Sequence, residues 1–224
     1  MTYCLVPMTV SEIKSLIGKN FVKTFQKEMD EYLAPYRKNV AKGRPLSMGK
    51  ELWEYAVADS IKGAEWCGAG KSIIDVRIGD DIGIDVKSVS KELTSNATTE
   101  ASMFQTFQEE TRAYFNASDT KSIWELFIDG WLKKVKSVKE YYLIGIVREK
   151  ETLNCSLCCF KVENTSLLYE DKSCTFTAKS MKVQGIGDPE FLETRVYSSK
   201  TRLEIKFKNK VWQDSDYCLP IYKF

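Results

Sequence analysis

Histidine is the residue that this sequence lacks, since none of its 224 positions is a histidine. The absence excludes every mechanism that needs an imidazole as a general base, a nucleophile or a metal ligand. It removes Ser-His-Asp triads, HNH and phospholipase-D-type nucleases, His-ligated zinc hydrolases and zinc deaminases. Any hydrolysis by this chain must therefore depend on carboxylates, lysines and a metal ion.

Long apolar runs are also missing. The chain has no stretch of roughly 18 apolar residues and no basic segment that leads into a shorter apolar one, so neither a membrane span nor a signal peptide is supported. We therefore expect a cytoplasmic protein. Its seven cysteines are an odd number, which favours reduced thiols over a disulfide framework.

The size and composition of the chain suit one folded unit. With 224 residues and 43% hydrophobic content, it can bury a full core, and we expect a single domain over 1–224. Within it we expect an N-terminal helical segment over 1–45, a catalytic core over 46–150 and a strand-rich region over 151–224. The net charge of +2 neither demands nor excludes a nucleic-acid partner.

The most informative pattern lies in residues 74–87. Aliphatic and polar side chains alternate over 74–78, and the alternation resumes over 82–87 after a Gly-Asp-Asp turn signal. This predicts an antiparallel hairpin with one aliphatic face and one polar face. Keeping the aliphatic face continuous requires an odd-numbered loop centred on Asp80. That register sets Asp75 directly opposite Asp85.

Two carboxylates placed directly opposite repel unless something positive lies between them. A divalent cation resolves the conflict, and carboxylate oxygens with water and phosphate suit Mg²⁺. Lys87 lies two residues beyond Asp85 on the same face, where its ammonium can reach a metal-bound water or a phosphate oxygen, and Gly83 leaves open space nearby. The hairpin therefore predicts a magnesium site at Asp75 and Asp85. The alternative is an exposed polar face on which a lysine offsets two carboxylates.

A family resemblance rests on the same residues. Asp75, nine intervening residues and then Asp85-Val86-Lys87 resemble the PD-(D/E)xK signature of restriction-endonuclease-like nucleases, although Ile74 stands where the signature has proline. Other acidic-x-lysine triplets occur, such as Glu204-Ile-Lys206. Only the triplet at Asp85 has a matched acid on a partner strand.

The resemblance implies an α/β fold, with a restriction-endonuclease-like mixed β-sheet flanked by α-helices and a strand-rich C-terminal part. It implies magnesium-dependent, site-specific cleavage of double-stranded DNA that leaves 5′-phosphates, as in type II restriction endonucleases. Asp75 and Asp85 would hold Mg²⁺, and Lys87 would help deprotonate or orient the attacking water. A homodimer and a companion DNA methyltransferase acting on the same site are the expected partners. The alternatives are a repair, recombination or phage nuclease of this fold and a non-catalytic DNA-binding protein.

The family also has a glutamate on a helix that precedes the hairpin. Residues 47–61 predict this helix, with Ser47 as its N-cap. Its inward stripe consists of Trp53, Ala56, Val57 and Ser60. Glu54 lies roughly 110° from the centre of that stripe and can lean toward the hairpin to support the metal, whereas Glu51 faces solvent. An ordinary surface carboxylate is the alternative for Glu54.

Hydrophobic periodicity predicts the remaining elements. We expect helices over 9–34, ended by Pro35, and over 100–115 and 121–138. A central strand is expected over 141–147, and further strands over 154–162, 173–178, 194–198 and 201–212.

Two short motifs favour other chemistry only weakly. Gly68-Ala-Gly-Lys-Ser72 resembles the end of a P-loop, but it lacks the first glycine of that motif and leads into a strand instead of a helix. Cys155-Ser-Leu-Cys158 has a zinc-like spacing without a second pair, so buried strand cysteines are the favoured interpretation.

Basic and hydroxyl side chains in two segments are candidates for DNA contacts. One segment covers residues 36–50, and the other lies in the basic-faced strands near the C-terminus. The candidates are Lys42, Arg44, Lys50, Arg195, Ser199, Lys200 and Arg202. A solvated loop is the alternative for the first segment, and an ordinary solvated sheet face is the alternative for each residue of the second.

Overall fold

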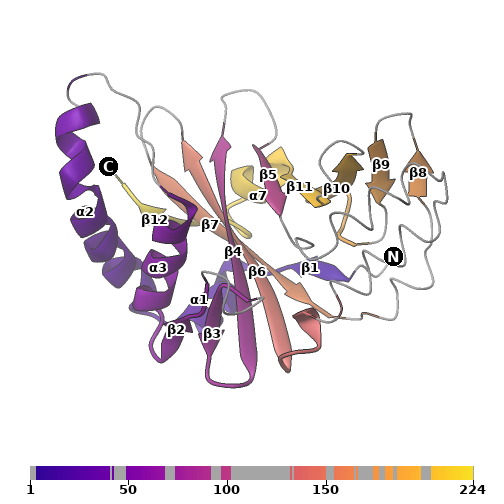
Figure 1. Cartoon of the computed structure of the whole chain (residues 1–224), viewed down its shortest axis with the longest axis horizontal. Helices are drawn as coiled ribbons and strands as arrows, with labels where there is room; N and C mark the ends of the chain where they lie inside the picture. Colours follow the sequence, from indigo (N-terminus) through magenta and orange to yellow (C-terminus); the bar gives the residue numbers. More distant parts are fainter. Residues whose placement is uncertain are drawn as a thin grey trace.

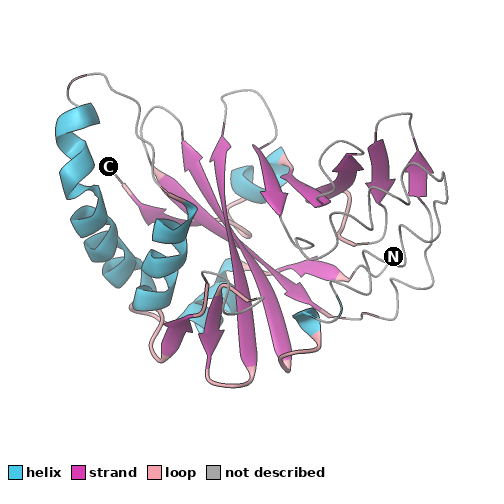
Figure 2. Cartoon of the chain, viewed as in Figure 1, coloured by secondary structure: helices cyan, strands magenta, loops and turns pink. Residues whose placement is uncertain are grey.

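The structure, a computed structural model, consists of two β-sheets with helices packed on the larger one (Figures 1 and 2). It describes residues 4–40, 42, 49–68, 74–91, 97–101, 132, 134–149, 154–163, 165, 174–176, 180–183, 186–197 and 203–223. Among these residues, no helix is long and apolar enough to cross a membrane.

A seven-stranded sheet forms the centre of the fold, in the order β1-β7-β6-β4-β3-β2, with β12 also paired to β7. Its strands are β1 (Leu5–Pro7), β2 (Ala64–Trp66), β3 (Val76–Ile78), β4 (Ile82–Lys91), β6 (Glu140–Glu149), β7 (Cys155–Val162) and β12 (Leu219–Tyr222). Strands β4 and β6 run parallel, and the other neighbours run antiparallel. The predicted mixed sheet is therefore confirmed, as is the central strand expected over 141–147.

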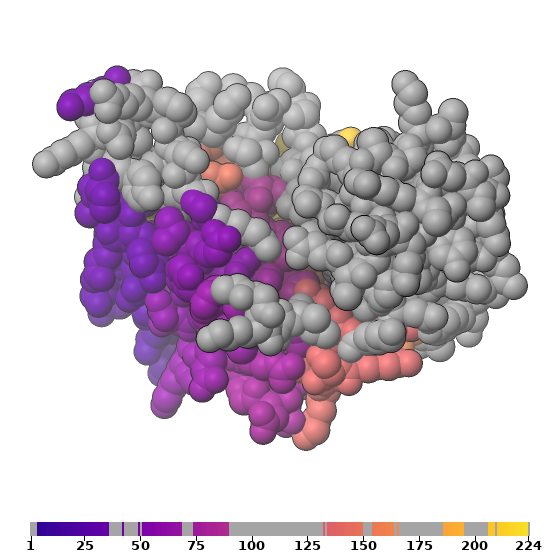
Figure 3. Space-filling view, viewed as in Figure 1, coloured from indigo at the N-terminus to yellow at the C-terminus, as the bar shows by residue number. Residues whose placement is uncertain are grey.

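Three helices cover one face of this sheet: α1 (Val10–Ile17), α2 (Phe21–Val40) and α3 (Lys50–Ser60). Side chains from all three helices join those of the central strands in one apolar cluster, which includes Ile13, Phe25, Trp53, Ile84, Val86 and Ile144. The predicted inward stripe of α3 is buried throughout. Figure 3 shows α2 in indigo and α3 in purple, side by side on the face that it draws.

The single helix predicted over 9–34 is in fact two helices. Thr9 begins α1 with a capping box, in which Glu12 accepts a hydrogen bond from the Thr9 backbone N–H and donates one from its own N–H to the Thr9 hydroxyl. Gly18 then ends α1 with a φ of 83°, a conformation that costs glycine little. The periodic pattern continues across this break because both helices bury their apolar faces against the same sheet.

Two predicted helix boundaries are wrong. Helix α2 continues through Pro35 to Val40, because an interior proline removes one hydrogen bond and bends a helix without always ending it. Helix α3 begins at Lys50, with Gly49 and not Ser47 at the N-cap position.

The other face of the main sheet carries a second apolar cluster and a second sheet. This sheet has five antiparallel strands in the order β5-β11-β10-β9-β8. Its strands are β5 (Ala97–Ala101), β8 (Cys174–Phe176), β9 (Ser180–Val183), β10 (Leu192–Tyr197) and β11 (Leu203–Phe207). Leu192 and Phe207 from this sheet pack with Leu143 and Phe160 of the main sheet. The C-terminal part is therefore strand-rich, as predicted.

The remaining predictions differ at particular elements. The strand expected over 201–212 ends at Phe207, and α7 (Asn209–Gln213) follows it. Residues 97–101 form β5, so the helix expected over 100–115 does not begin at 100. The rest of that helix, and most of the one expected over 121–138, lies outside the described residues. At the end of the second range, Leu132, Lys134 and Val135 are helical.

Candidate functional site

The hairpin of β3 and β4 has the predicted register. Val76 pairs with Ile84, Arg77 with Gly83, and Ile78 with Ile82, so the loop is centred on Asp80. Gly79 has a φ of 57°, which lets the chain reverse at this point. The ladder stops at the pair Val76 and Ile84, and Asp75 lies one residue before it, at the bend that precedes β3.

Over residues 84–87, strand β4 presents opposite chemistry on its two faces. Ile84 and Val86 belong to the apolar cluster beneath α1, α2 and α3, whereas Asp85 and Lys87 alternate with them and point to the other face. This second face is not exposed, because Asp85 is 0% and Lys87 only 4% accessible to solvent. An exposed polar hairpin face, the alternative raised by the sequence, is therefore excluded.

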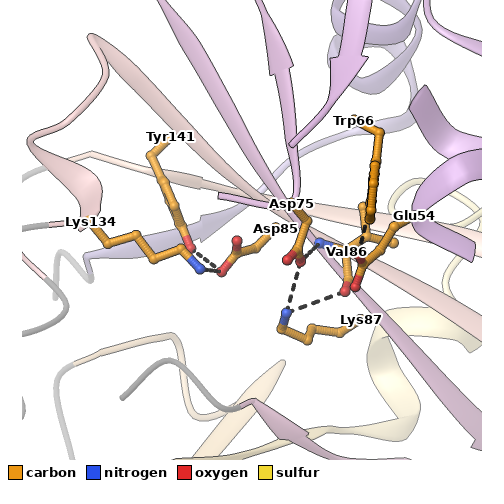
Figure 4. A network of polar contacts seen from close by, with 8 residues as sticks. All are labelled: Glu54, Trp66, Asp75, Asp85, Val86, Lys87, Lys134 and Tyr141. Atoms are coloured by element: carbon orange, nitrogen blue, oxygen red, sulfur yellow. Dashed lines mark hydrogen bonds and ion pairs between the residues drawn. The ribbon is translucent and has the colours of Figure 1, made fainter. Parts of the chain in front are cut away.

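Asp85 is held by two groups from a later part of the chain. Its Oδ2 accepts hydrogen bonds from Lys134 Nζ and from the Tyr141 hydroxyl, each at 2.5 Å (Figure 4). Its Oδ1 is buried and has no hydrogen-bond partner among the described residues. Burial by itself raises the pKa of Asp85, but the charges of Lys134 and Lys87 and the two hydrogen bonds outweigh it, so the pKa is lowered. Asp85 is therefore a buried carboxylate that keeps its negative charge.

Asp75 and Lys87 form the second half of the site. Asp75 lies just before β3, and its Oδ2 accepts hydrogen bonds from the Val86 N–H at 2.9 Å and from Lys87 Nζ at 3.0 Å. Burial by itself lowers the pKa of Lys87, but the negative charges of Asp85, Asp75 and Glu54 outweigh it, and the pKa is raised. The Lys87 ammonium thus lies in the field of three carboxylates.

Glu54 approaches the site from α3. It is 3% exposed, and its Oε2 accepts a hydrogen bond from Trp66 Nε1 at 3.2 Å. An ordinary surface carboxylate is therefore excluded at this position, while Glu51 is exposed as expected. Figure 4 shows Glu54, Asp75 and Lys87 on one side of Asp85 and Lys134 and Tyr141 on the other.

The space beside Gly83 is filled, contrary to the prediction. A Cβ atom built on Gly83 would meet Ile74 Cδ1 at 2.7 Å and Val138 Cγ2 at 3.0 Å. Ile74 was expected on the aliphatic face, but it lies over Gly83 on the face of Asp85. The alternation fails here because the chain bends at residues 74 and 75, before β3 begins at Val76.

Lys134 and Tyr141 are members of this cluster that the sequence interpretation did not assign to it. They are separated from Asp85 by 49 and 56 residues. The parallel pairing of β4 with β6 brings them near, because it aligns Gly83 with Tyr141 and Asp85 with Leu143. In the sequence, Lys134 is only one lysine near the end of the helix predicted over 121–138, and Tyr141 is only a tyrosine in an apolar strand. Neither pattern indicates a contact with Asp85.

The candidate DNA contacts are not brought together by the described residues. Lys42 is exposed. Lys50 begins α3 and Arg195 lies in β10, but their side chains are not described. The other four candidates, Arg44, Ser199, Lys200 and Arg202, lie outside the described residues.

The described cysteines do not form a metal site. Cys155 belongs to the cluster beneath the helices and Cys158 to the cluster on the opposite face, so they cannot bind one zinc ion together. Both are buried strand cysteines, as the sequence favoured. Among the residues that the structure describes, no group of three or more His, Cys, Asp or Glu side chains is arranged to hold a metal. A cation at Asp75 and Asp85 would therefore need water or substrate oxygens to complete its coordination.

A cavity of about 490 Å³ lies away from this cluster, where α1 approaches the start of β4 and β6. Two of the acidic side chains that line it already have structural partners. Glu12 belongs to the capping box of α1, and Glu140 accepts a hydrogen bond from Tyr142 and pairs with Lys161. The cavity carries no buried charge comparable to that of the cluster at Asp85, so this cluster is the stronger functional candidate.

Comparisons of the chain with protein-family models, with curated proteins and with solved structures gave no match in any of the three.

Proposed function

We propose that this chain is a magnesium-dependent nuclease of the PD-(D/E)xK type that hydrolyses phosphodiester bonds in DNA. One observation carries the proposal: the ammonium of Lys87 lies among three acids from three different elements or their flanks, all largely removed from water. Burying charges is costly, and replacing them with apolar residues often leaves a fold equally stable. A cluster of this kind is therefore better accounted for by chemistry than by folding.

The residues present suit a magnesium ion. Asp75 and Asp85 would hold it, and the buried Oδ1 of Asp85, which lacks a hydrogen-bond partner among the described residues, supplies an oxygen for this purpose. The donors are all carboxylate oxygens, as a hard cation prefers. When bound, the metal would acidify a water molecule and offset negative charge that develops on the phosphate.

The protein groups have separable roles in this proposal. Lys87 has three N–H donors, of which the contacts to Asp75 and to the Val86 carbonyl use two within the described structure. The third can orient the attacking water or bind a phosphate oxygen. Glu54, fixed by Trp66, adds negative charge on the side of Lys87 away from Lys134 and supports the site from α3.

Two features of the arrangement of elements support the proposal. Helix α3 precedes the hairpin and carries the glutamate, and β6 extends the sheet beside β4. On this basis the proposal includes a restriction-endonuclease-like core. Site-specific cleavage with 5′-phosphate products, and a two-fold homodimer on a palindromic site, follow by analogy with the family.

A plasmid-cleavage assay tests the proposal. Supercoiled DNA is incubated with the protein in Mg²⁺ or in EDTA, using the natural chain and the Asp85→Asn and Asp75→Asn variants. Asp81→Asn is the matched control, because Asp81 is an exposed aspartate in the same hairpin. We expect nicked or linear DNA only with Mg²⁺, unchanged rates for the control, and a loss of at least about 100-fold in both site variants.

The same assay separates the competing functions. Discrete bands indicate a site-specific enzyme, and a smear indicates a nuclease without sequence preference. Cleavage that persists in both site variants contradicts the assignment of the site. Intact plasmid that is nevertheless retarded in a gel shift supports the non-catalytic DNA-binding protein instead.

A further inference from the structure

Lys134 is a buried cation that the proposed chemistry does not need as a ligand or as a water-orienting group. It is 7% exposed, and its ammonium contacts Oδ2 of Asp85, the same oxygen that accepts from Tyr141. The two donors therefore occupy one oxygen of the carboxylate. The other oxygen, Oδ1, has no hydrogen-bond partner within the described part of the chain.

We infer that Lys134 tunes this site: its ammonium, held on Oδ2 of Asp85, keeps the free protein's affinity for a divalent cation low. The inference rests on the proposed metal site at Asp75 and Asp85. It assigns to Lys134 a role that acts through Asp85 and involves no contact with substrate.

The charges of the cluster give the direction of the effect. Glu54, Asp75 and Asp85 carry three negative charges, and Lys87 and Lys134 carry two positive ones, which leaves one net negative charge. Without the charge of Lys134, the cluster has a net charge of two negative units. Charges at this depth are poorly screened, so one positive charge beside a ligand substantially weakens the binding of a dication. A phosphodiester would restore a negative charge at the site, so the metal binds most tightly together with DNA.

The consequence is a site that couples its metal to its substrate. Without DNA, the Lys134 ammonium partly satisfies Asp85 and the cation exchanges readily. With DNA, a phosphate oxygen adds both negative charge and a ligand. Neutralising Lys134 should uncouple the two events by strengthening metal binding in the absence of DNA.

Mn²⁺ binding to the purified full chain without DNA tests this inference, with free Mn²⁺ measured by electron paramagnetic resonance. Lys134→Met removes the charge and keeps the length of the side chain, and Lys134→Gln removes the charge but keeps a hydrogen-bond donor. Lys134→Arg keeps the charge. Lys136→Met is the matched control, because Lys136 is exposed two residues further on.

We expect the two neutral variants to bind Mn²⁺ about tenfold more tightly than the natural chain, while Lys134→Arg and Lys136→Met stay within about twofold of it. Structural damage would weaken binding, so tighter binding in the neutral variants distinguishes the electrostatic role of Lys134 from a merely structural one. Lys134→Gln gives the answer if the methionine variant does not fold.

Unchanged or weaker binding in a folded neutral variant would overturn the inference alone, provided that the natural chain binds Mn²⁺ and Asp85→Asn does not. If neither the natural chain nor the neutral Lys134 variants bind Mn²⁺ more tightly than Asp85→Asn, the proposed metal site fails, and the inference fails with it.

Discussion

At residues 84–87 the two faces of strand β4 are buried to nearly the same extent but differ in chemistry. On one face, Ile84 and Val86 are 0% and 1% exposed and pack beneath three helices. On the other, Asp85 and Lys87 are 0% and 4% exposed and contact only charged or polar partners in the hydrogen bonds that the structure describes. Consecutive residues of one strand therefore lie alternately in an apolar and in a charged environment, both of them buried.

The two faces contribute differently to the free energy of folding. An apolar face stabilises a protein roughly in proportion to the area that it buries. A buried ion pair recovers little more than its cost of desolvation, yet breaking it leaves an uncompensated charge. The charged face thus adds little net stability, although none of its charges can be removed without cost. This is the pattern expected where a site performs chemistry.

The largest expected effect comes from making the charged face incomplete. Asp85→Leu leaves Lys134 and Lys87 buried without their shared partner, and we expect a loss of about 3–5 kcal/mol in the free energy of unfolding. Urea denaturation monitored by tryptophan fluorescence measures this loss.

The double variant Asp85→Leu/Lys134→Met sharpens the same test, because it converts the broken pair into an apolar one. We expect it to recover most of the lost stability while remaining inactive. A double variant as unstable as the single one would mean that the charged face contributes to folding as the apolar face does.

Ile84→Ala tests the apolar face at a neighbouring position. The side chain is fully buried, so we expect a loss of about 2–4 kcal/mol from lost transfer free energy and the cavity left behind. Mn²⁺ affinity should stay within about twofold of the natural value, since Ile84 points away from the carboxylates. A large fall in metal affinity would show that the two faces are coupled and would break the comparison.

The local parts of the fold and site were predictable because they depend on neighbours in sequence. Alternation over 74–87 determined the register of β3 with β4, and periodicity over α3 identified its buried stripe and the position of Glu54 beside it. In both cases a repeat of side-chain character reports directly on which face is inside.

The partners of Asp85 were not predictable for the opposite reason. Lys134 and Tyr141 reach it only through the parallel pairing of β4 with β6, a contact across about 50 residues that no local pattern encodes. Strands β1 and β12 were missed because three or four residues are too few to show a period. Ile74 was assigned to the wrong face because the alternation was extended past a bend in the chain.

A smaller effect on stability is expected at Gly83, which lies on the same face of β4 as Asp85 and is covered by Ile74 and Val138. In Gly83→Ala the new methyl group would meet Ile74 and Val138 at distances shorter than ordinary contact, so we expect overpacking to cost about 1–3 kcal/mol. Thermal denaturation measures this loss of stability. Gly63→Ala is the contrasting variant, because Gly63 has a φ of 78° but no neighbour within 4 Å, so any loss there comes from backbone strain and not from overpacking. Unchanged stability in Gly83→Ala would mean that the space beside Asp85 is open after all.

The smallest expected effect is on the chemical reactivity of cysteines. The cysteines of strand β7 report how well water is excluded from each face of the main sheet. Cys155 and Cys159 lie on the helix-covered face and Cys158 on the other, and burial raises the pKa of all three thiols, that of Cys155 to about 12. Thiolate forms only as pH approaches the pKa, so at pH 8 these thiols stay protonated and react slowly with iodoacetamide. Cys67, which is partly exposed, serves as the reactive reference.

Peptide mass spectrometry after timed alkylation gives each rate separately. We expect Cys158 and Cys159 to be labelled equally slowly in the native protein and as fast as Cys67 in denaturant. Faster labelling of Cys158 than of Cys159 in the native protein would show that water reaches the face of Asp85 more readily than the face beneath the helices. The charges of Asp85, Lys87 and Lys134 would then be partly screened, and the effects expected on removing them would shrink accordingly.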